Sequence, residues 1–376
     1  MELRKLTNQE YLKAAQLSMY AFQYTLTEKA LETALQKMDK HTILSIWDED
    51  ELASKLHILS LKVNVNGQQW NMGGIAGVAT YPEYRRKGYV KKLLTAALSE
   101  MNQNKQFLSF LHPFDISFYR KFGWEVLTDV KKITIEKANL SPIGRPSGTI
   151  IRYKKESHRL EFEKIYQAFS TFYSGPLIRT SDWWKNSVYS DEQIAVYYDG
   201  EGNGQGYLLY SVKDNIMTVE EYVWLNYEAR SQLWNFICQH DSMIDRAIIN
   251  TSVHDPFPYL LQQPKQKIEI IPYFMARIVN VKEVLARYNF LHTEQSLSLS
   301  INDEFAPWNN ITYRLGEDEG DDPVLEMNIN ALTAILTGYK RPMELYEMNF
   351  IRGNRDTASA LEEKIPPLKT YFMDFF

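Results

Sequence analysis

The sequence lacks the features that define several large classes of protein. It holds one cysteine, Cys238, in 376 residues, which excludes an intrachain disulfide framework and a zinc site built from cysteines. Its seven histidines are scattered without an HxxxH pair, so no metal site is expected. No apolar run is long enough to predict a transmembrane helix, and the first residues lack the apolar core of a signal peptide. Together these absences predict a protein of a reducing, cytoplasmic compartment.

The charge balance lacks the basic excess that is typical of nucleic-acid-binding proteins. Lys and Arg number 42 against 47 Asp and Glu, which gives a net charge of −5. Hydrophobic residues make up 44% of the chain and charged residues 24%, as in an ordinary globular protein. Because 376 residues exceed what one hydrophobic core usually supports, we expect two or three domains and no nucleic-acid partner. Aromatic residues are in surplus, at 13%.

The first 140 residues alternate between strand and helix patterns. Thr7 and Glu10 form a capping box before the first helix, and Asn66-Gly67 is typical of a hairpin turn. Apolar residues recur with helical spacing at 90–101. The expected strands are 3–6, 42–47, 52–65, 74–80, 107–111 and 124–136, and the expected helices are 11–22, 27–38, 90–101 and 115–122. This alternation predicts an α/β domain.

The rest of the chain divides after a linker rich in proline, glycine and serine at residues 138–149. Residues 150–275 repeat the strand, helix, strand order of the first domain, which suggests a diverged internal repeat. Residues 276–376 mix short helices and strands, with one strand expected at 308–315, and end in an aromatic tail. The acidic run at 317–322 is most simply a solvated loop. We therefore expect domains at 1–140, 150–275 and 276–376.

The loop before the helix at residues 90–101 carries the clearest chemical signal. A strand ends at residues 78–80, three basic residues follow at 85–87, and Gly88 lies where the helix begins. The first amides of a helix lack intrahelical acceptors and the helix dipole is positive there, so an anion such as pyrophosphate fits this position. The alternative interpretation is a solvated basic turn.

Residues 85–90, Arg-Arg-Lys-Gly-Tyr-Val, resemble the [RQ]-x-x-G-x-[GA] signature of the GNAT acetyltransferases, with Val90 in place of the final small residue. The whole chain is similar to a narrower group, the Eis family. Residues 117–124, Ser-Phe-Tyr-Arg-Lys-Phe-Gly-Trp, match that family's Y-x-x-F-G-[YW] stretch. Residues 305–309, Phe-Ala-Pro-Trp-Asn, resemble a motif of its third domain, and the chain ends in an aromatic residue, Phe376.

This resemblance implies a fold class and a co-substrate. The fold would be α/β (α+β), with two tandem GNAT domains, the second degenerate, followed by a sterol-carrier-protein-like domain. The co-substrate would be acetyl-CoA, with its pantetheine along the end of one strand and its pyrophosphate at the following helix. The implied cofactor-binding residues are Val78, Ala79, Thr80, Arg85, Arg86, Lys87, Gly88, Tyr89, Val90, Lys91, Phe114 and Asp115.

Two aromatic residues carry the catalytic roles that the resemblance implies. Tyr119 occupies the position of the Eis proton donor, and a tyrosine with a pKa of about 10 stays protonated at neutral pH. The alternative role for Tyr119 is a core aromatic. The α-carboxylate of Phe376 is implied as the general base, since a pKa of about 3.5 keeps it ionised. Its alternative is a C-terminal strand that only packs.

The resemblance also implies a class of substrate. Eis-type enzymes acetylate amines of cationic compounds, such as aminoglycosides and lysine side chains, and are hexamers. A polyamine is a further candidate, and an acidic protein would attract all of these substrates. The alternative is a binding protein, whose sterol-carrier-like domain holds an apolar ligand while coenzyme A only regulates it.

Several other features favour a structural interpretation. The glycine-rich stretch 202–206 predicts a hairpin turn, and the second-repeat loop 226–230 lacks the glycine and basic pair that a cofactor loop needs. His112 is expected at the end of a strand, and Cys238 is expected to be a small buried apolar residue. Trp183-Trp184 is expected in a core or an interface.

Overall fold

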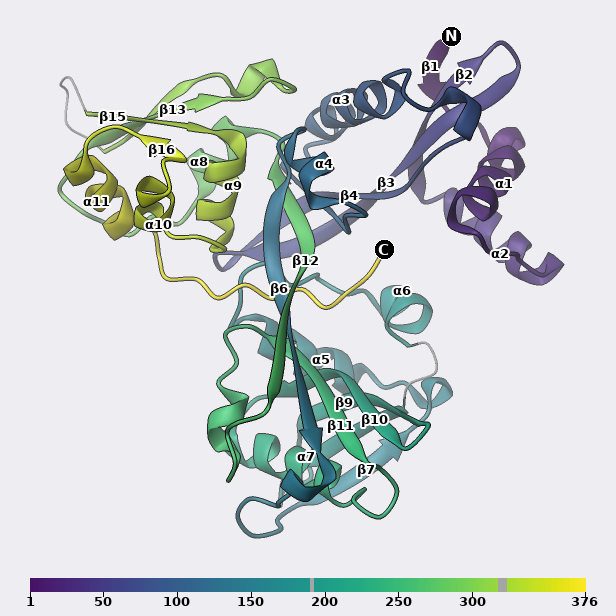
Figure 1. The fold of residues 1–376 in the computed structure, drawn as a ribbon, viewed down its shortest axis with the longest axis vertical. Helices are drawn as coiled ribbons and strands as arrows, with labels where there is room; N and C mark the ends of the chain where they lie inside the picture. Colours follow the sequence, from purple (N-terminus) through teal and green to yellow (C-terminus); the bar gives the residue numbers. More distant parts are fainter. Residues whose placement is uncertain (190–192, 317–322) are drawn as a thin grey trace. The chain divides into compact units, whose positions relative to one another are not determined.

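The computed structural model describes residues 1–189, 193–316 and 323–376. The acidic run expected as a loop, 317–322, lies outside the described residues. The chain forms two compact units: unit 1 comprises residues 1–126, 274–367 and 376, and unit 2 comprises residues 127–273 and 368–375. Figure 1 shows the elements of both units. Within the described ranges, no helix combines the length and apolarity needed to cross a membrane.

The main sheet of unit 1 follows the order β1-β2-β3-β4-β5-β12. Its strands are β1 (Glu2–Lys5), β2 (His41–Asp48), β3 (Glu51–Val65), β4 (Gln68–Thr80), β5 (Leu108–Leu111) and the end of β12 (Lys267–Ile278). β4 and β5 are parallel, whereas the other pairs are antiparallel. The predicted hairpin joins β3 and β4, and both Asn66 and Gly67 have the positive φ that this turn requires.

Helices cover the two faces of this sheet. α3 (Tyr89–Gln103) packs its apolar stripe, including Leu93 and Leu94, against Ile75 of β4 and Ile58 of β3. α1 (Tyr11–Phe22) and α2 (Glu28–Met38) lie beside each other and pack on the opposite face, where Ala79 of β4 belongs to their core. The short α4 (Ile116–Arg120) follows β5. The helices predicted from the sequence are confirmed.

Unit 1 also contains a smaller sheet with the order β14-β13-β15-β16. Its strands are β13 (Leu297–Asn302), β14 (Thr312–Leu315), β15 (Val324–Asn328) and β16 (Ile351–Arg352), and its helices are α8 (Val281–Arg287), α9 (Ile329–Thr337), α10 (Pro342–Glu347) and α11 (Arg355–Lys364). The strand expected at 308–315 was wrong in its first half, which is a 3₁₀ turn at Pro307–Asn309. The side chain of Asn310 also bonds to the backbone of Asp303 at 2.7 and 3.2 Å, so it holds a turn instead of a strand.

The sheet of unit 2 follows the order β6-β11-β10-β9-β8-β7. Its strands are β6 (Glu125–Glu136), β7 (Thr149–Tyr153), β8 (Gln193–Tyr198), β9 (Gly204–Lys213), β10 (Ile216–Trp224) and β11 (Arg246–Ser252), and its helices are α5 (Leu160–Ser170), α6 (Ser181–Trp183) and α7 (Tyr227–Cys238). β10 and β11 are parallel and are joined through α7, as β4 and β5 are joined through α3. The turn predicted between β8 and β9 is confirmed, and Cys238 and Trp184 are buried as expected.

The aromatic tail docks into unit 2 without forming a strand. Thr370 makes one isolated bridge with Ser174, and Tyr371 and Phe372 are buried. Arg179 holds the tail more firmly, because its guanidinium bonds both to Asp374 at 2.9 Å and to Glu221 at 2.7 Å. These ion pairs are almost completely buried, so unit 2 fixes residues 368–375.

Candidate active site

The parallel strands β4 and β5 separate at the centre of unit 1. The first paired residues are Met72 and Leu108, and the last are Ile75 and Leu111. Strand β5 ends at Leu111, but β4 continues to Thr80. A bulge against β3 bends β4 at this point, and Gly77 adopts a positive φ of 54°. The predicted cofactor residues 78–80 therefore lie on the part of β4 that extends beyond its parallel partner. Beyond Ile75 no residue of β5 pairs with this part of β4.

The loop after β4 has the features of an anion site. Gly88 is the N-cap of α3 with a φ of 75°, and no side chain caps the helix. A methyl group at Gly88 would meet nothing within 4 Å, so the approach to the first helical amides is open. Arg85, Arg86 and Lys87 are all exposed around it. Open amides, the helix dipole and three cations fit a pyrophosphate group.

The other predicted residues at the start of α3, Tyr89, Val90 and Lys91, differ in their exposure to solvent. The side chain of Tyr89 is buried in the core beneath α3, so only its backbone is available to a ligand. Val90 is half-buried. Lys91 is exposed, and its ammonium group lies 3.6 Å from the carboxylate of Glu304 and over the ring of Phe305. The departure at Val90 leaves the amide pattern of the helix start unchanged.

Tyr119 is a buried residue of α4. It is 3% exposed, and its ring packs against Phe114 and Trp124. Burial raises the pKa of its hydroxyl above the usual value, so the group holds its proton at neutral pH. Asp115 caps α4 by accepting the amide proton of Phe118 at 2.9 Å, which fixes the helix that carries Tyr119.

Phe376 belongs to unit 1, unlike the eight preceding residues. Its ring lies 5.1 Å from that of Phe274 on β12, and it also lies against Gly74 of β4. Phe274 contacts His112, just beyond the end of β5, with a ring separation of 5.6 Å. The loop after β5 thus contacts the surroundings of Phe376 through His112 and contacts Tyr119 through Phe114. Phe114 is 74% exposed, which leaves its ring available to a ligand.

The part of unit 1 that contains the smaller sheet packs against the turn that follows Tyr119. Phe305 contacts Phe122 with a ring separation of 5.1 Å, and the Asn330 amide donates to the carbonyl of Trp124 at 2.9 Å. Asp303 pairs with the fully buried Arg277 at 2.7 Å. This explains the motif at 305–309, which joins the third part of the chain to the segment carrying Tyr119.

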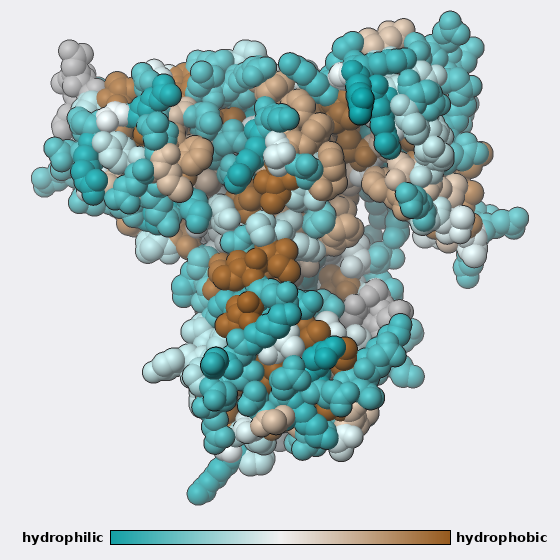
Figure 2. Space-filling view, viewed as in Figure 1, coloured by the Kyte–Doolittle hydropathy of each residue, from teal (hydrophilic) through white to brown (hydrophobic). Residues whose placement is uncertain are grey.

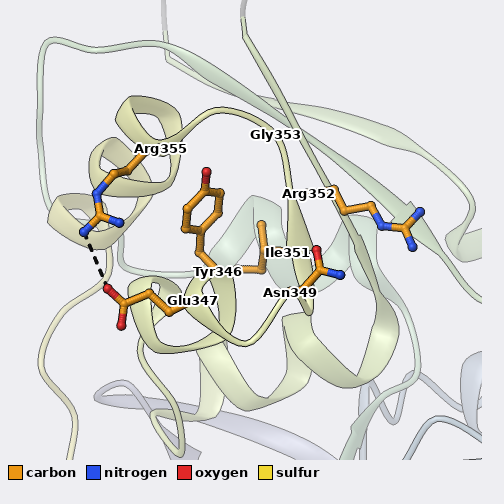
Figure 3. Close-up of a pocket in the computed structure, with 7 residues that line it drawn as sticks. All are labelled: Tyr346, Glu347, Asn349, Ile351, Arg352, Gly353 and Arg355. Carbon is orange, nitrogen blue, oxygen red and sulfur yellow. Dashed lines mark hydrogen bonds and ion pairs between the residues drawn. The ribbon is translucent and has the colours of Figure 1, made fainter.

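A separate pocket beside the smaller sheet is lined by Tyr346, Glu347, Asn349, Ile351, Arg352, Gly353 and Arg355. In Figure 3, Arg355 reaches toward Glu347, while Arg352 points away on the other side of the pocket. The 3.5 Å ion pair between Arg355 and Glu347 adds charge to its wall. This polar lining does not favour an apolar ligand.

The sequence analysis missed three titratable residues beside this site: His41, Lys55 and His57. They lie on neighbouring strands, and the pairing of β2 with β3 brings His41 and His57 together across sixteen residues of chain. Lys55 and His57 are separated by one residue, and any two residues at this spacing point to the same face of a regular strand, so the spacing alone does not indicate a site. Their burial and the bulge opposite them are tertiary features, so no local pattern of residues marks them as a site.

Comparison with known families defines the class of protein. A GNAT acetyltransferase domain model matches residues 2–127, a second GNAT domain model matches residues 175–278, and a sterol carrier protein domain model matches residues 281–373. The chain therefore has two GNAT domains and a C-terminal sterol-carrier-like domain. The predicted fold class is confirmed, and the internal repeat consists of two GNAT domains.

Individual relatives show which GNAT proteins the chain is similar to. N-acetyltransferase Eis of Mycobacterium tuberculosis is 26% identical over 247 residues, and the match spans 61% of each chain. The crystal structure of a conserved protein of unknown function from Enterococcus faecalis, described as a probable N-acyltransferase, superposes with a TM-score of 0.93 and 26% identity over 100% of this chain and 99% of that one. Eis1 from Mycobacterium abscessus shares the fold over the full length of both chains, with a TM-score of 0.83 and 17% identity. The chain belongs to the GNAT acetyltransferases and is similar to their Eis-type members.

Proposed function

We propose that the protein transfers an acetyl group from acetyl-CoA to primary amines of cationic compounds. The observation that carries this proposal is the separation of β4 from β5 beside the uncapped start of α3. Acetyl-CoA supplies an activated acetyl thioester. Val78, Ala79 and Thr80 would hold its pantetheine through backbone groups, and Arg85, Arg86, Lys87 and Gly88 would hold its phosphates together with the amides of Tyr89, Val90 and Lys91. Phe114 and Asp115 would flank the acetyl end.

Tyr119 is the proposed general acid. Its raised pKa keeps the hydroxyl protonated until a proton is needed at the departing sulfur. The carboxylate of Phe376 is the proposed group that binds the cationic amine and acts as its base. Support comes from the position of the Phe376 ring against Gly74, near the end of the paired region of β4 and β5. The loop that contacts Tyr119 also contacts Phe274, the neighbour of Phe376.

The acceptor class is part of the proposal. Aminoglycosides, polyamines and lysine side chains all present alkylammonium groups, which a terminal carboxylate and a net charge of −5 attract. We also propose a cytoplasmic homo-oligomer, expected to be a hexamer. Figure 2 shows apolar patches among hydrophilic residues, and β12 exposes Ile268, Ile270 and Ile271, as an assembly surface would. Sedimentation equilibrium would measure the number of subunits.

A thiol-release assay with acetyl-CoA tests the activity across aminoglycosides, polyamines and lysine peptides. Tyr119→Phe should lower kcat by about 100-fold or more while acetyl-CoA binding persists, because the ring remains and only the proton is lost. Two residues added after Phe376 should lower turnover and leave acetyl-CoA affinity unchanged. The absence of thiol release with every amine would refute the proposed activity, and an unchanged kcat in Tyr119→Phe would remove that residue as the acid.

The alternative is a binding protein regulated by coenzyme A. Extra residues after Phe376 should then have no effect on function. The curated relatives match over 61% of their length, so their activity is carried to this chain as a proposal. The pocket at residues 346–355 has a polar lining, which does not suit an apolar ligand.

A further inference from the structure

A chain of three titratable side chains crosses β2, β3 and β4 of unit 1. The Lys55 ammonium group lies 3.0 Å from the carbonyl oxygen of Gly77 and 2.9 Å from Nε2 of His57. The other ring nitrogen of His57, Nδ1, lies 3.2 Å from Nδ1 of His41. The three side chains therefore form one continuous hydrogen-bonded path that starts at the bulge of β4.

The path runs from a buried amine toward the surface. Lys55 has no exposed area, His57 is 7% exposed and His41 is half-buried. Burial lowers the pKa of Lys55 to about 7, and burial together with the Lys55 charge lowers the pKa of both histidines. Lys37 of α2 also lowers the pKa of His41, while β4 contributes only the Gly77 carbonyl. A lysine in this state gains and loses a proton near neutral pH.

This path lies on the same sheet face as Phe376. A methyl group at Gly74 would meet Phe376 and Leu61, whereas one at Gly77 would meet Lys55 and His57. His57 is paired with Ala76, two residues along β4 from Gly74. Ile75, between them, points to the opposite face and packs with α3. The titratable path and the terminal residue therefore lie on one surface of β4, over positions three residues apart.

The chemistry of the proposed reaction requires such a group. An alkylammonium ion with a pKa near 10 must lose a proton to become a nucleophile, and a carboxylate with a pKa near 3.5 is a poor acceptor, by roughly six to seven orders of magnitude. An acceptor that titrates near the working pH is much better matched. The carboxylate of Phe376 can attract the ammonium ion and act as its first base, but a group of higher pKa must then take the proton from it.

We propose that Lys55 accepts the proton that a bound alkylammonium substrate loses, and that His57 and His41 return this proton to water. The inference rests on the proposed acetyltransferase function. The ammonium group gives one proton, by way of the carboxylate of Phe376, to neutral Lys55. Its nitrogen lone pair forms the bond to the acetyl carbon while the carbon–sulfur bond breaks. The sulfur takes a proton from Tyr119, which regains one from the new amide nitrogen. The products are an amide, a thiol and one proton released to solvent.

The test is the pH dependence of kcat/KM for Lys55→Met with a strongly basic amine. We expect a loss of about tenfold or more at pH 7 that shrinks as the pH rises and the amine deprotonates in solution. A weakly basic amine that is already neutral at pH 7 should show little difference between Lys55→Met and wild type. Lys364→Met is the matched control, because Lys364 is also a buried lysine of unit 1 but lies at the end of α11 and bonds to Thr293.

His57→Gln provides a second test that does not depend on the folding of Lys55→Met. Glutamine keeps a hydrogen-bonding side chain beside Lys55 but does not titrate, so the same loss at pH 7 is expected. If the wild type turns over and the folded variants have the same pH profile as the wild type, this inference is overturned, whereas the proposed function is not. The absence of wild-type turnover at every pH and with every amine would refute the proposed function, and the inference with it.

Discussion

Replacing Gly74 with alanine should displace Phe376 and reveal whether the end of the chain takes part in the reaction. An added methyl carbon would lie 2.7 Å from Cε2 of Phe376 and 3.1 Å from both Cζ of that ring and Cδ1 of Leu61. Gly74 does not have a positive φ, so alanine itself causes no backbone strain there. The conflict is therefore confined to the side chains that the methyl group meets.

The size of the displacement follows from the contact distances. Ordinary contact begins at 3.4 Å, so the ring must move by about 0.7 Å to relieve the 2.7 Å contact. A shift of about 1 Å in a reacting group lowers a rate by roughly 100-fold. We therefore expect kcat/KM to fall about 10- to 100-fold in the thiol-release assay, while overpacking lowers the free energy of unfolding by about 1–3 kcal/mol.

Two controls make this experiment specific. Gly200→Ala adds a methyl group at a turn where nothing lies within 4 Å, and it should leave turnover unchanged. In a protein already extended beyond Phe376, Gly74→Ala should cause little further loss, because the two changes act through the same group. Turnover of the folded Gly74→Ala variant within about twofold of wild type would refute the reasoning.

Two further predictions concern buried ion pairs. Asp303→Asn removes the negative charge beside fully buried Arg277, so it should lower the free energy of urea unfolding of unit 1 by about 3–5 kcal/mol. Glu304→Gln, at an exposed pair, should change that free energy by less than about 1 kcal/mol. Equal effects of the two substitutions would contradict the burial argument. Arg179→Met should speed hydrogen exchange at the Tyr371 amide, which is bonded to Ser174, because Asp374 and Glu221 lose their shared cation. Arg230→Met breaks another buried pair of unit 2, with Asp255, and should leave the tail protected; tail exchange that is equal in both variants would show that Arg179 does not hold it.

Local signals allowed much of the fold to be predicted. The helical spacing of Leu93, Leu94 and Ala97 predicted α3, and Asn66-Gly67 predicted the β3–β4 turn. The strand expected through residues 308–311 was wrong because Asn310 bonds to the backbone of Asp303 and forms a turn. Helix α11 was not predicted, since its mean hydropathy is low and its packing residues are mostly small.

The candidate site shows the same difference between local features, which the sequence reveals, and tertiary features, which it does not. The sequence alone determined the basic loop and Gly88, because a helix start and its flanking charges are local features. Only the tertiary structure brought Phe376 against Gly74 and joined His41 to Lys55 through His57, because strand pairing and the docking of the tail connect residues far apart in the chain. Burial, which gives Lys55 its lowered pKa, is likewise a property of the folded protein and not of any short segment.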